Sequence, residues 1–356
     1  MIFRRANYSN SRTISNNITL ADGTSSSLRC GWDSGSILNL TGEISGKGSL
    51  EIANDQYTVQ LSNSNTYSGG TKIGGGKNGW GGGGQGALVL AAENALGTGA
   101  VTFGSAKSYF DMGGFNQTIG GLYDMTGLTG IGTVKNTGAA AMLTLDVAKG
   151  EDYSWSGALE NVENLSIVKE GEGSQTFTTA KSYSSVTVNK GALTLPSGST
   201  ISGLLLLSNE ASVDIAPTSL EEYVTIQNAN FTNSSVWKIN IDSLTSFSRF
   251  AFENVPLFDD LYGFLDIDVD ENANLPNNAE FKVSNTLPGV SYTDMESWLT
   301  AEDRYEWNLL WNSANNAMLL QRDSAAVPEP SSWLLLILGV GLLVVSRKPR
   351  VVLFRF

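Results

Sequence analysis

The sequence contains no histidine and a single cysteine, Cys30, among its 356 residues. Histidine is the base of Ser-His-Asp and Cys-His couples and a common zinc ligand, so those catalytic and metal sites are excluded. One cysteine cannot form an internal disulfide or a zinc ribbon. Because no histidine exists to activate its thiol, we interpret Cys30 as structural. We therefore expect a non-catalytic protein that needs no cofactor.

Basic side chains are also few, with 22 Lys and Arg against 35 Asp and Glu, a formal net charge of −13. Nucleic-acid binding requires clustered Lys and Arg, so we expect no nucleic-acid partner. Four of the basic residues lie in the last ten positions: Arg347, Lys348, Arg350 and Arg355. Setting these four aside takes the formal charge from −13 to −17 for residues 1–346.

Glycine is abundant, with 39 residues, and hydrophobic residues make up 41% of the chain. Short apolar or alternating segments recur between Gly, Asn, Ser and Asp, and period-two alternation predicts strands with one buried face. These segments are residues 14–20, 37–40, 87–90, 100–103, 143–147, 165–168, 185–188, 192–195, 204–207 and 236–241. Such closely spaced strands fit a sandwich, a barrel or a stacked solenoid.

Internal similarity favours the solenoid. Two stretches of the chain repeat the same order of strand, Gly/Asn turn and strand. The first stretch consists of residues 65–73, 86–90 and 94–103, and the second consists of residues 165–173 and 185–195. A single turn of this kind cannot bury its own apolar face, so successive turns must stack. Glycine and asparagine suit the corners because they tolerate positive φ, and asparagine can also form side-chain ladders between turns.

Three blocks carry a family resemblance: Asn-Thr-Tyr-Ser-Gly-Gly-Thr at 65–71, Ala-Leu-Gly-Thr-Gly-Ala-Val-Thr at 95–102, and Gly-Phe-Asn-Gln-Thr-Ile-Gly-Gly-Leu at 114–122. They resemble the autotransporter-associated β-strand repeat, over roughly residues 12–210. The resemblance implies an all-β fold, a right-handed parallel β-helix of the kind found in exported passenger regions.

Aromatic residues become more frequent and glycine less frequent after residue 230. We interpret this part as the last turns of the solenoid and a terminal cap, with a capping-box helix over 293–303. A hairpin of strands 305–311 and 317–321 is expected to follow. The predicted organisation is a solenoid over 1–230, terminal turns and cap over 231–323, a proline-containing linker over 324–332, a transmembrane helix over 333–346 and a basic cytoplasmic tail over 347–356.

The C-terminal segment combines three signals in order. Val327, Pro328, Glu329 and Pro330 precede an uncharged apolar run over residues 333–345. The run would span roughly 20 Å as a helix, short for a hydrocarbon core of about 30 Å. We nevertheless prefer a membrane span to a buried core helix, because the run is apolar on every side. The basic residues that follow, Arg347, Lys348 and Arg350, predict a cytoplasmic C-terminus.

This tripartite pattern resembles the PEP-CTERM sorting signal of Gram-negative bacteria. The resemblance implies recognition by exosortase, an integral-membrane peptidase. It also implies a precursor anchored in the inner membrane and a mature protein at the cell surface or secreted. Exopolysaccharide or biofilm matrix is then a candidate partner. An export signal is expected upstream of Met1, since the basic start over residues 1–5 leads into a polar segment over 6–11.

Asp266, Asp268 and Asp270 are the candidate site for chemistry, because spacing of two places carboxylates on one side of a strand. They suit Ca²⁺ or the acidic cluster of a β-helix polysaccharide lyase or hydrolase. An EF-hand would need glycine at the position of Glu271, so that motif fails. We favour a solvated polar face at these residues.

Residues 74–79 match G-x-G-x-x-G formally, but the glycines that follow Trp80 give no helix for a dinucleotide. We interpret the segment as a flexible turn excursion. The sequence as a whole predicts an exported, non-catalytic surface or matrix protein. A polysaccharide-cleaving β-helix enzyme and a glycan-binding adhesin are the alternatives.

Overall fold

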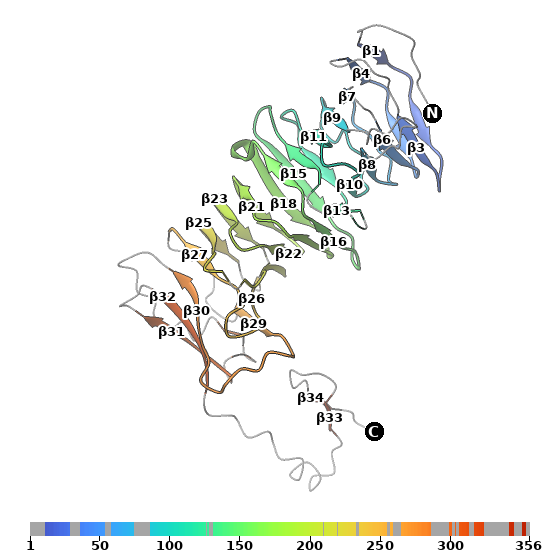
Figure 1. Ribbon diagram of the computed structural model, residues 1–356. Helices are drawn as coiled ribbons and strands as arrows, with labels where there is room; N and C mark the ends of the chain where they lie inside the picture. Colours follow the sequence, from blue (N-terminus) through green and yellow to red (C-terminus); the bar gives the residue numbers. More distant parts are fainter. Residues whose placement is uncertain are drawn as a thin grey trace.

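The computed structural model describes residues 11–28, 36–53, 58–74, 86–125, 127, 131–208, 210–218, 220–232, 235–254, 257–258, 265–285, 299–300, 303, 306–312, 317–323, 342–344 and 351–353. Within these residues the chain is an all-β solenoid of about nine turns, in which nearly all strand pairs are parallel. Figure 1 shows the turns stacked in chain order, from β1 at one end to β30, β31 and β32 at the other. The predicted stacked parallel solenoid is confirmed; its right-handed sense stays a prediction.

In the N-terminal half each turn has three short sides. One seven-stranded sheet runs in the order β1 (Arg12–Ile14), β4 (Ile37–Leu40), β7 (Thr58–Leu61), β9 (Ala87–Leu90), β11 (Tyr109–Asp111), β14 (Thr133–Lys135) and β17 (Ala158–Glu160). A two-stranded sheet pairs β2 (Ile18–Leu20) with β5 (Ile44–Gly46). A five-stranded sheet runs in the order β3 (Ser25–Leu28), β6 (Ser49–Ile52), β8 (Thr71–Ile73), β10 (Val101–Phe103) and β13 (Leu122–Asp124).

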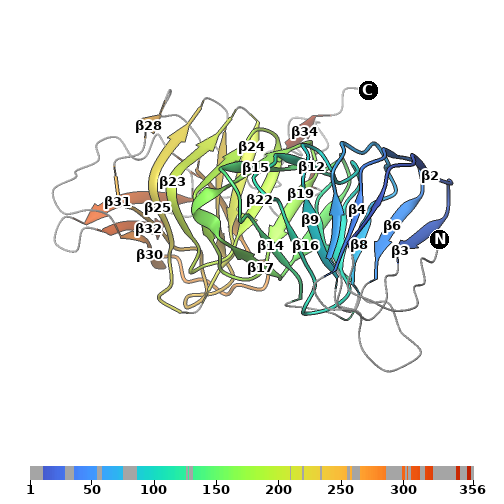
Figure 2. The same cartoon turned by 90° about the horizontal axis from the view of Figure 1, so that it is seen from above.

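In the C-terminal half two larger sheets take over, and Figure 2 shows the stack from above. A six-stranded sheet runs in the order β16 (Asp152–Trp155), β19 (Ser174–Phe177), β22 (Gly191–Leu195), β24 (Ala211–Ile215), β26 (Val236–Ile241) and β29 (Leu265–Val269). A twelve-stranded sheet contains β12 (Gln117–Ile119), β15 (Ala141–Asp146), β18 (Leu165–Glu170), β20 (Ser182–Tyr183), β21 (Ser185–Val188), β23 (Thr200–Leu207), β25 (Val224–Phe231), β27 (Phe250–Phe252), β28 (Leu257–Phe258), β30 (Glu280–Asn285), β32 (Ala317–Arg322) and β31 (Trp307–Asn312). Among the described residues, the helical structure consists of one 3₁₀ turn, Val162–Asn164.

The strands follow the alternation that the sequence shows. In β4, β7 and β21 every second side chain is buried, so each strand contributes two inward side chains to one continuous core. The predicted segments 37–40, 87–90, 185–188 and 236–241 coincide with β4, β9, β21 and β26. The predicted single strand over 14–20 is wrong, because a corner divides it into β1 and β2. At that corner the Asn17 side chain accepts a hydrogen bond from the Glu43 amide, at 3.0 Å.

Buried amide side chains join successive turns at the corners. Asn65, which is 5% exposed, accepts a hydrogen bond from the Ile44 amide at 2.7 Å and donates one to the Ala95 carbonyl. It therefore contacts the turn before its own and the turn after it. Three further buried amides serve backbone groups of other turns in the same way: Gln117, Asn136 and Gln175. These four side chains bond to backbone groups of other turns, and the predicted side-chain ladder between turns occurs where the Asn254 side chain donates to the Asn228 side chain at 2.9 Å.

Glycine is required where two corners touch. A Cβ on Gly99 would lie 2.3 Å from the Gly70 amide nitrogen, and one on Gly69 would lie 2.4 Å from the Gly48 carbonyl carbon. No side chain fits at such separations. The motif Gly-Gly at 69–70 and the motif Gly-Thr-Gly at 97–99 therefore lie where corners of successive turns are in close backbone contact.

An antiparallel cap ends the twelve-stranded sheet. β32 pairs antiparallel with both β30 and β31, which confirms the predicted hairpin. The predicted helix over 293–303 is wrong at Leu299, which forms a parallel bridge with Leu265; residues 293–298 lie outside the described part. The open edge of β29 attracts this segment, because unpaired strand groups need partners. The Asp303 carboxylate accepts a hydrogen bond from the Ile267 amide at 3.0 Å.

The predicted transmembrane helix over 333–346 is not supported. Its residues 342–344 form strand β33 (Leu342–Val344), which pairs antiparallel with β34 (Val351–Leu353), and residues 333–341 and 345–346 lie outside the described part. The valines of the two strands, Val344, Val351 and Val352, have β-branched side chains, which favour strands. Where the structure is described, no helix has the length and apolar character that crossing a bilayer requires.

Candidate functional site

The acidic residues near 266–270 do not form one row. Asp266 is half-buried on β29 and Asp268 is exposed on the same face. Asp270 follows the strand, where its carboxylate accepts a hydrogen bond from the Asn272 amide at 2.7 Å and so caps a turn. In the described part of the chain, no group of three or more His, Cys, Asp or Glu side chains is placed to hold a metal ion.

Asp266 instead belongs to a column of alternating charge. It is in register with Lys238 of β26, which is in register with Asp214 of β24. Burial raises the pKa of Asp214; Lys238 lowers it, and Asp266 and Asp268 raise it further. Asp214 and Asp266 are half-buried, and a lysine between two carboxylates on neighbouring strands is a stabilising arrangement. These three side chains therefore form a polar column across β24, β26 and β29.

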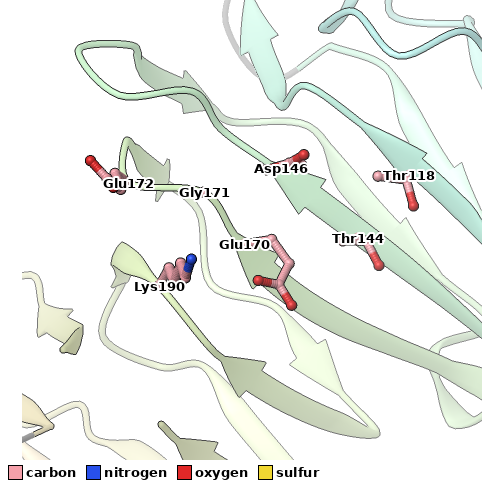
Figure 3. Close-up of a pocket in the computed structure, with 7 residues that line it drawn as sticks. All are labelled: Thr118, Thr144, Asp146, Glu170, Gly171, Glu172 and Lys190. Atoms are coloured by element: carbon pink, nitrogen blue, oxygen red, sulfur yellow. The ribbon is translucent and has the colours of Figure 1, made fainter. Parts of the chain in front are cut away.

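A hollow of about 490 Å³ lies on the outer side of the twelve-stranded sheet, and no sequence pattern predicted it. It is lined by Thr118, Thr144, Asp146, Glu170, Gly171, Glu172 and Lys190. Figure 3 shows these residues on neighbouring strands and on the turns beside them. Thr118 is in register with Thr144, and Asp146 is in register with Glu170, so β12, β15 and β18 each contribute outward side chains.

The floor of the hollow is held from inside by Lys169. Its side chain is fully buried, and its ammonium donates hydrogen bonds to the carbonyls of Glu170 at 2.6 Å and Gly171 at 2.9 Å. A third hydrogen bond goes to the carbonyl of Lys190, on the next turn, at 3.3 Å. Burial lowers the pKa of Lys169 to about 8, while Asp146 and Glu170 oppose that shift.

Two of the lining carboxylates have partners on the protein. Glu172 forms an ion pair with Lys149 at 3.1 Å, in which both side chains are largely exposed. Glu170 accepts a hydrogen bond from the Asn189 side chain at 2.6 Å. Asp146 differs, since within the described residues its carboxylate has no hydrogen bond or ion pair. The hollow therefore presents the Asp146 carboxylate, able to accept further hydrogen bonds, beside threonine hydroxyls and a lysine.

Sequence reasoning missed this site because its residues are spread over positions 118–190. Alternation does mark Thr144, Asp146 and Glu170 as outward-facing, but register between turns decides which of them meet. Cys30, Trp80 and the residues of the glycine-rich segment after Gly74 lie outside the described part, as do Val327, Pro328, Glu329, Pro330, Arg347, Lys348 and Arg350.

Comparison with protein families identifies the C-terminal segment. Residues 326–351 match the model of the PEP-CTERM protein-sorting motif. The chain carries a PEP-CTERM sorting motif. This motif is associated with export and with processing by exosortase, a membrane protein. The match contains the predicted Pro328, Glu329 and Pro330 together with the basic residues after the apolar run.

Comparison with curated proteins finds a relative among the autotransporters. The chain is 30% identical over 187 residues to the adhesin BmaC autotransporter of Brucella suis biovar 1 (strain 1330). The match covers 50% of this chain and 5% of that protein, so the chain spans about one twentieth of the relative's length. The PEP-CTERM motif and this likeness to an autotransporter adhesin agree with the resemblances that the sequence shows.

Proposed function

We propose that this chain is an exported, non-catalytic protein of the cell surface or extracellular matrix, sorted by its PEP-CTERM motif and processed by an exosortase-type membrane peptidase. The observation that carries the proposal is the match of residues 326–351 to the sorting motif. Export agrees with the fold, because a stack of parallel strands is rigid without disulfides and presents a long outer surface. The precursor is held at the inner membrane of a Gram-negative cell and then displayed or released.

Surface display is supported by the named relative, an adhesin. A strongly acidic surface keeps an exposed protein soluble and disfavours nucleic-acid contact. The function we propose is therefore presentation of a surface to other molecules outside the cell.

A non-catalytic role is supported by the chemistry of the acidic residues. Asp270 caps a turn, and Asp266 lies in register with Lys238 in a charge column. Glycoside hydrolysis uses two carboxyl groups that flank the bond to be cleaved. If the full chain releases new reducing ends from a polysaccharide, and Asp266→Asn with Asp268→Asn abolishes that release, the non-catalytic role is wrong.

The sorting proposal is tested by fractionating cells that express the full-length gene in a host with an exosortase. We expect the triple substitution Pro328→Ala, Glu329→Ala, Pro330→Ala to retain the uncleaved protein in the membrane fraction. The matched control changes the two adjacent serines, Ser331→Ala and Ser332→Ala, which should leave sorting intact. Mass spectrometry of the C-terminus measures processing directly. Unchanged location and tail length in the triple variant would refute the proposal.

A further inference from the structure

The hollow on the twelve-stranded sheet is an open, polar depression that the sorting motif does not explain. Its volume of about 490 Å³ lies within the range of about 300–1,000 Å³ that small-ligand sites occupy. Its lining is built of polar side chains from strands that are far apart in the sequence. Neighbouring strands of a sheet are about 4.8 Å apart, so the hollow extends about 14 Å from β12 to the turn that follows β21.

The carboxylates of the hollow are arranged at a cost to the fold. Asp146 and Glu170 are in-register neighbours on the same face, and like charges placed directly opposite each other destabilise a sheet. Asn189 stabilises Glu170 through a hydrogen bond of 2.6 Å, and the buried Lys169 ammonium lies below both carboxylates. Asp146 keeps its hydrogen-bonding capacity open toward the hollow. A ligand that donates hydrogen bonds to this carboxylate would complete the arrangement.

The backbone that shapes the hollow has little freedom. Gly171 has φ of +72°, and a Cβ at this position would lie 2.1 Å from the Val147 carbonyl oxygen and 2.8 Å from an Asp146 carboxylate oxygen. Lys169 binds the carbonyls on both sides of this turn and the carbonyl of Lys190 on the next turn. The side chains of the hollow are therefore positioned before any ligand arrives, which lowers the entropic cost of binding.

The chemistry of the lining selects the ligand. Carboxylates accept hydrogen bonds from hydroxyl or amino groups, while threonine hydroxyls and the Lys190 ammonium donate to oxygen atoms. Lys149 is paired with Glu172 and Lys169 lies below Glu170, whereas the Asp146 carboxylate has no hydrogen bond or ion pair within the described residues, so it would repel the carboxylate of a uronate or the sulfate of a sulfated sugar placed against it. A metal ion fits less well, because the described residues hold no group of three or more potential ligands in one place.

We propose that this hollow binds a hydroxyl-rich saccharide without acidic groups, with Asp146 and Glu170 accepting hydrogen bonds from the sugar and Thr144 and Lys190 donating them. The site would give the exported protein a glycan partner, and it does not depend on the route by which the protein is sorted. The wide opening of the hollow predicts weak affinity for one short oligosaccharide. Repetition along a polysaccharide or among many displayed copies would raise the avidity.

The test measures calorimetric binding of three tetrasaccharides to the full chain in mild detergent: cellotetraose, chitosan tetrasaccharide and tetragalacturonate. We expect the first two to bind with Kd values of about 0.1–10 mM, chitosan tetrasaccharide more tightly and with more sensitivity to salt. Tetragalacturonate should not bind. Absence of binding by both non-acidic sugars at about 10 mM, or tighter binding of tetragalacturonate, would overturn the proposal.

Matched variants separate the hollow from the rest of the surface. Asp146→Asn should weaken saccharide binding about tenfold, because a charge-assisted hydrogen bond is lost. Asp268→Asn removes an equally exposed carboxylate elsewhere and should have no effect. Thr144→Phe should block the hollow, whereas Thr187→Phe, two strands further along the same outward column, should not. Circular dichroism checks that all four variants fold, and equal effects within each pair would exclude this site.

Discussion

Replacing Asn136 tests the view that corner amides hold the turns together. This side chain is 1% exposed and serves three turns of the solenoid. Its carbonyl oxygen accepts a hydrogen bond from the Gly114 amide at 2.9 Å, and its nitrogen donates to the carbonyls of Ala139 at 2.7 Å and Asn164 at 2.8 Å. Leucine fills a similar volume but removes the partner of these three backbone groups, and of the more distant Gly138 amide, which donates to the Asn136 oxygen at 3.3 Å.

The size of the effect follows from the number of groups that lose their partner. A buried polar group that loses its hydrogen-bond partner costs about 1–3 kcal/mol. Three such groups predict that Asn136→Leu lowers the free energy of unfolding by about 3–5 kcal/mol, toward the lower end of the sum because water can enter a relaxed corner. Asn136→Asp keeps the oxygen that accepts from the Gly114 amide, but its second carboxylate oxygen would face the carbonyl oxygens of Ala139 and Asn164. Because oxygen lone pairs repel each other, this variant should lose at least as much stability as Asn136→Leu at neutral pH.

Denaturant unfolding of the full chain, followed by tryptophan fluorescence, measures the shift in midpoint. The control is Asn308→Leu on β31, a half-buried asparagine, for which we expect a change below about 1 kcal/mol. Acid should recover part of the Asn136→Asp loss, because a protonated carboxyl can donate one hydrogen bond. A midpoint for Asn136→Leu within the error of the control would refute the idea that these amides stabilise the stack.

Two further predictions concern the buried lysines and the glycine corners. Burial lowers the pKa of Lys169 to about 8, below the ordinary value of 10.5, so between these values the unfolded chain binds more protons than the folded chain. Stability should therefore rise with pH from 8 toward 10, and denaturation of Lys169→Met at a series of pH values should show a shallower rise; an identical pH slope would contradict the assignment. Gly99→Ala should lower the melting temperature by several degrees, because its Cβ would lie 2.3 Å from the Gly70 nitrogen. Gly120→Ala at the same corner, where a Cβ would lie no closer than 3.0 Å to its nearest neighbour and φ is outside the left-handed region, serves as the milder comparison for calorimetry; equal melting temperatures would show that the corner can relax.

The strands were largely predictable because alternation is a local property. Residues 37–40 and 236–241 read as strands in the sequence and are strands in the structure, since an apolar side chain at every second position must face the core. The predictions failed where a distant partner decides the local conformation. Leu299 pairs with the open edge of β29, and a capping-box pattern at 293–296 carries no information about that edge.

The candidate sites were likewise predictable where they depend on contiguous residues and unpredictable where they depend on distant partners. The PEP-CTERM motif was found from contiguous residues, because a sorting peptidase recognises a short linear segment. The acidic residues at 266–270 were found from their spacing, but the turn after β29 removes Asp270 from the row and Lys238 supplies the neighbour of Asp266. Lys169 was not expected in the core, since lysine is seldom fully buried unless its ammonium has hydrogen-bond partners.

From the sequence by itself, composition determined an acidic chain without histidine-dependent chemistry, alternation predicted strands, internal similarity predicted a solenoid, and a contiguous C-terminal motif predicted the sorting tail. Only the tertiary structure decided that Asp146 lies beside Glu170, that Lys169 supports them from within, and that Thr118 and Thr144 continue the same wall. The physical reason is register. The turns of the solenoid differ in length, so side chains become neighbours only when every strand has settled against the one before it.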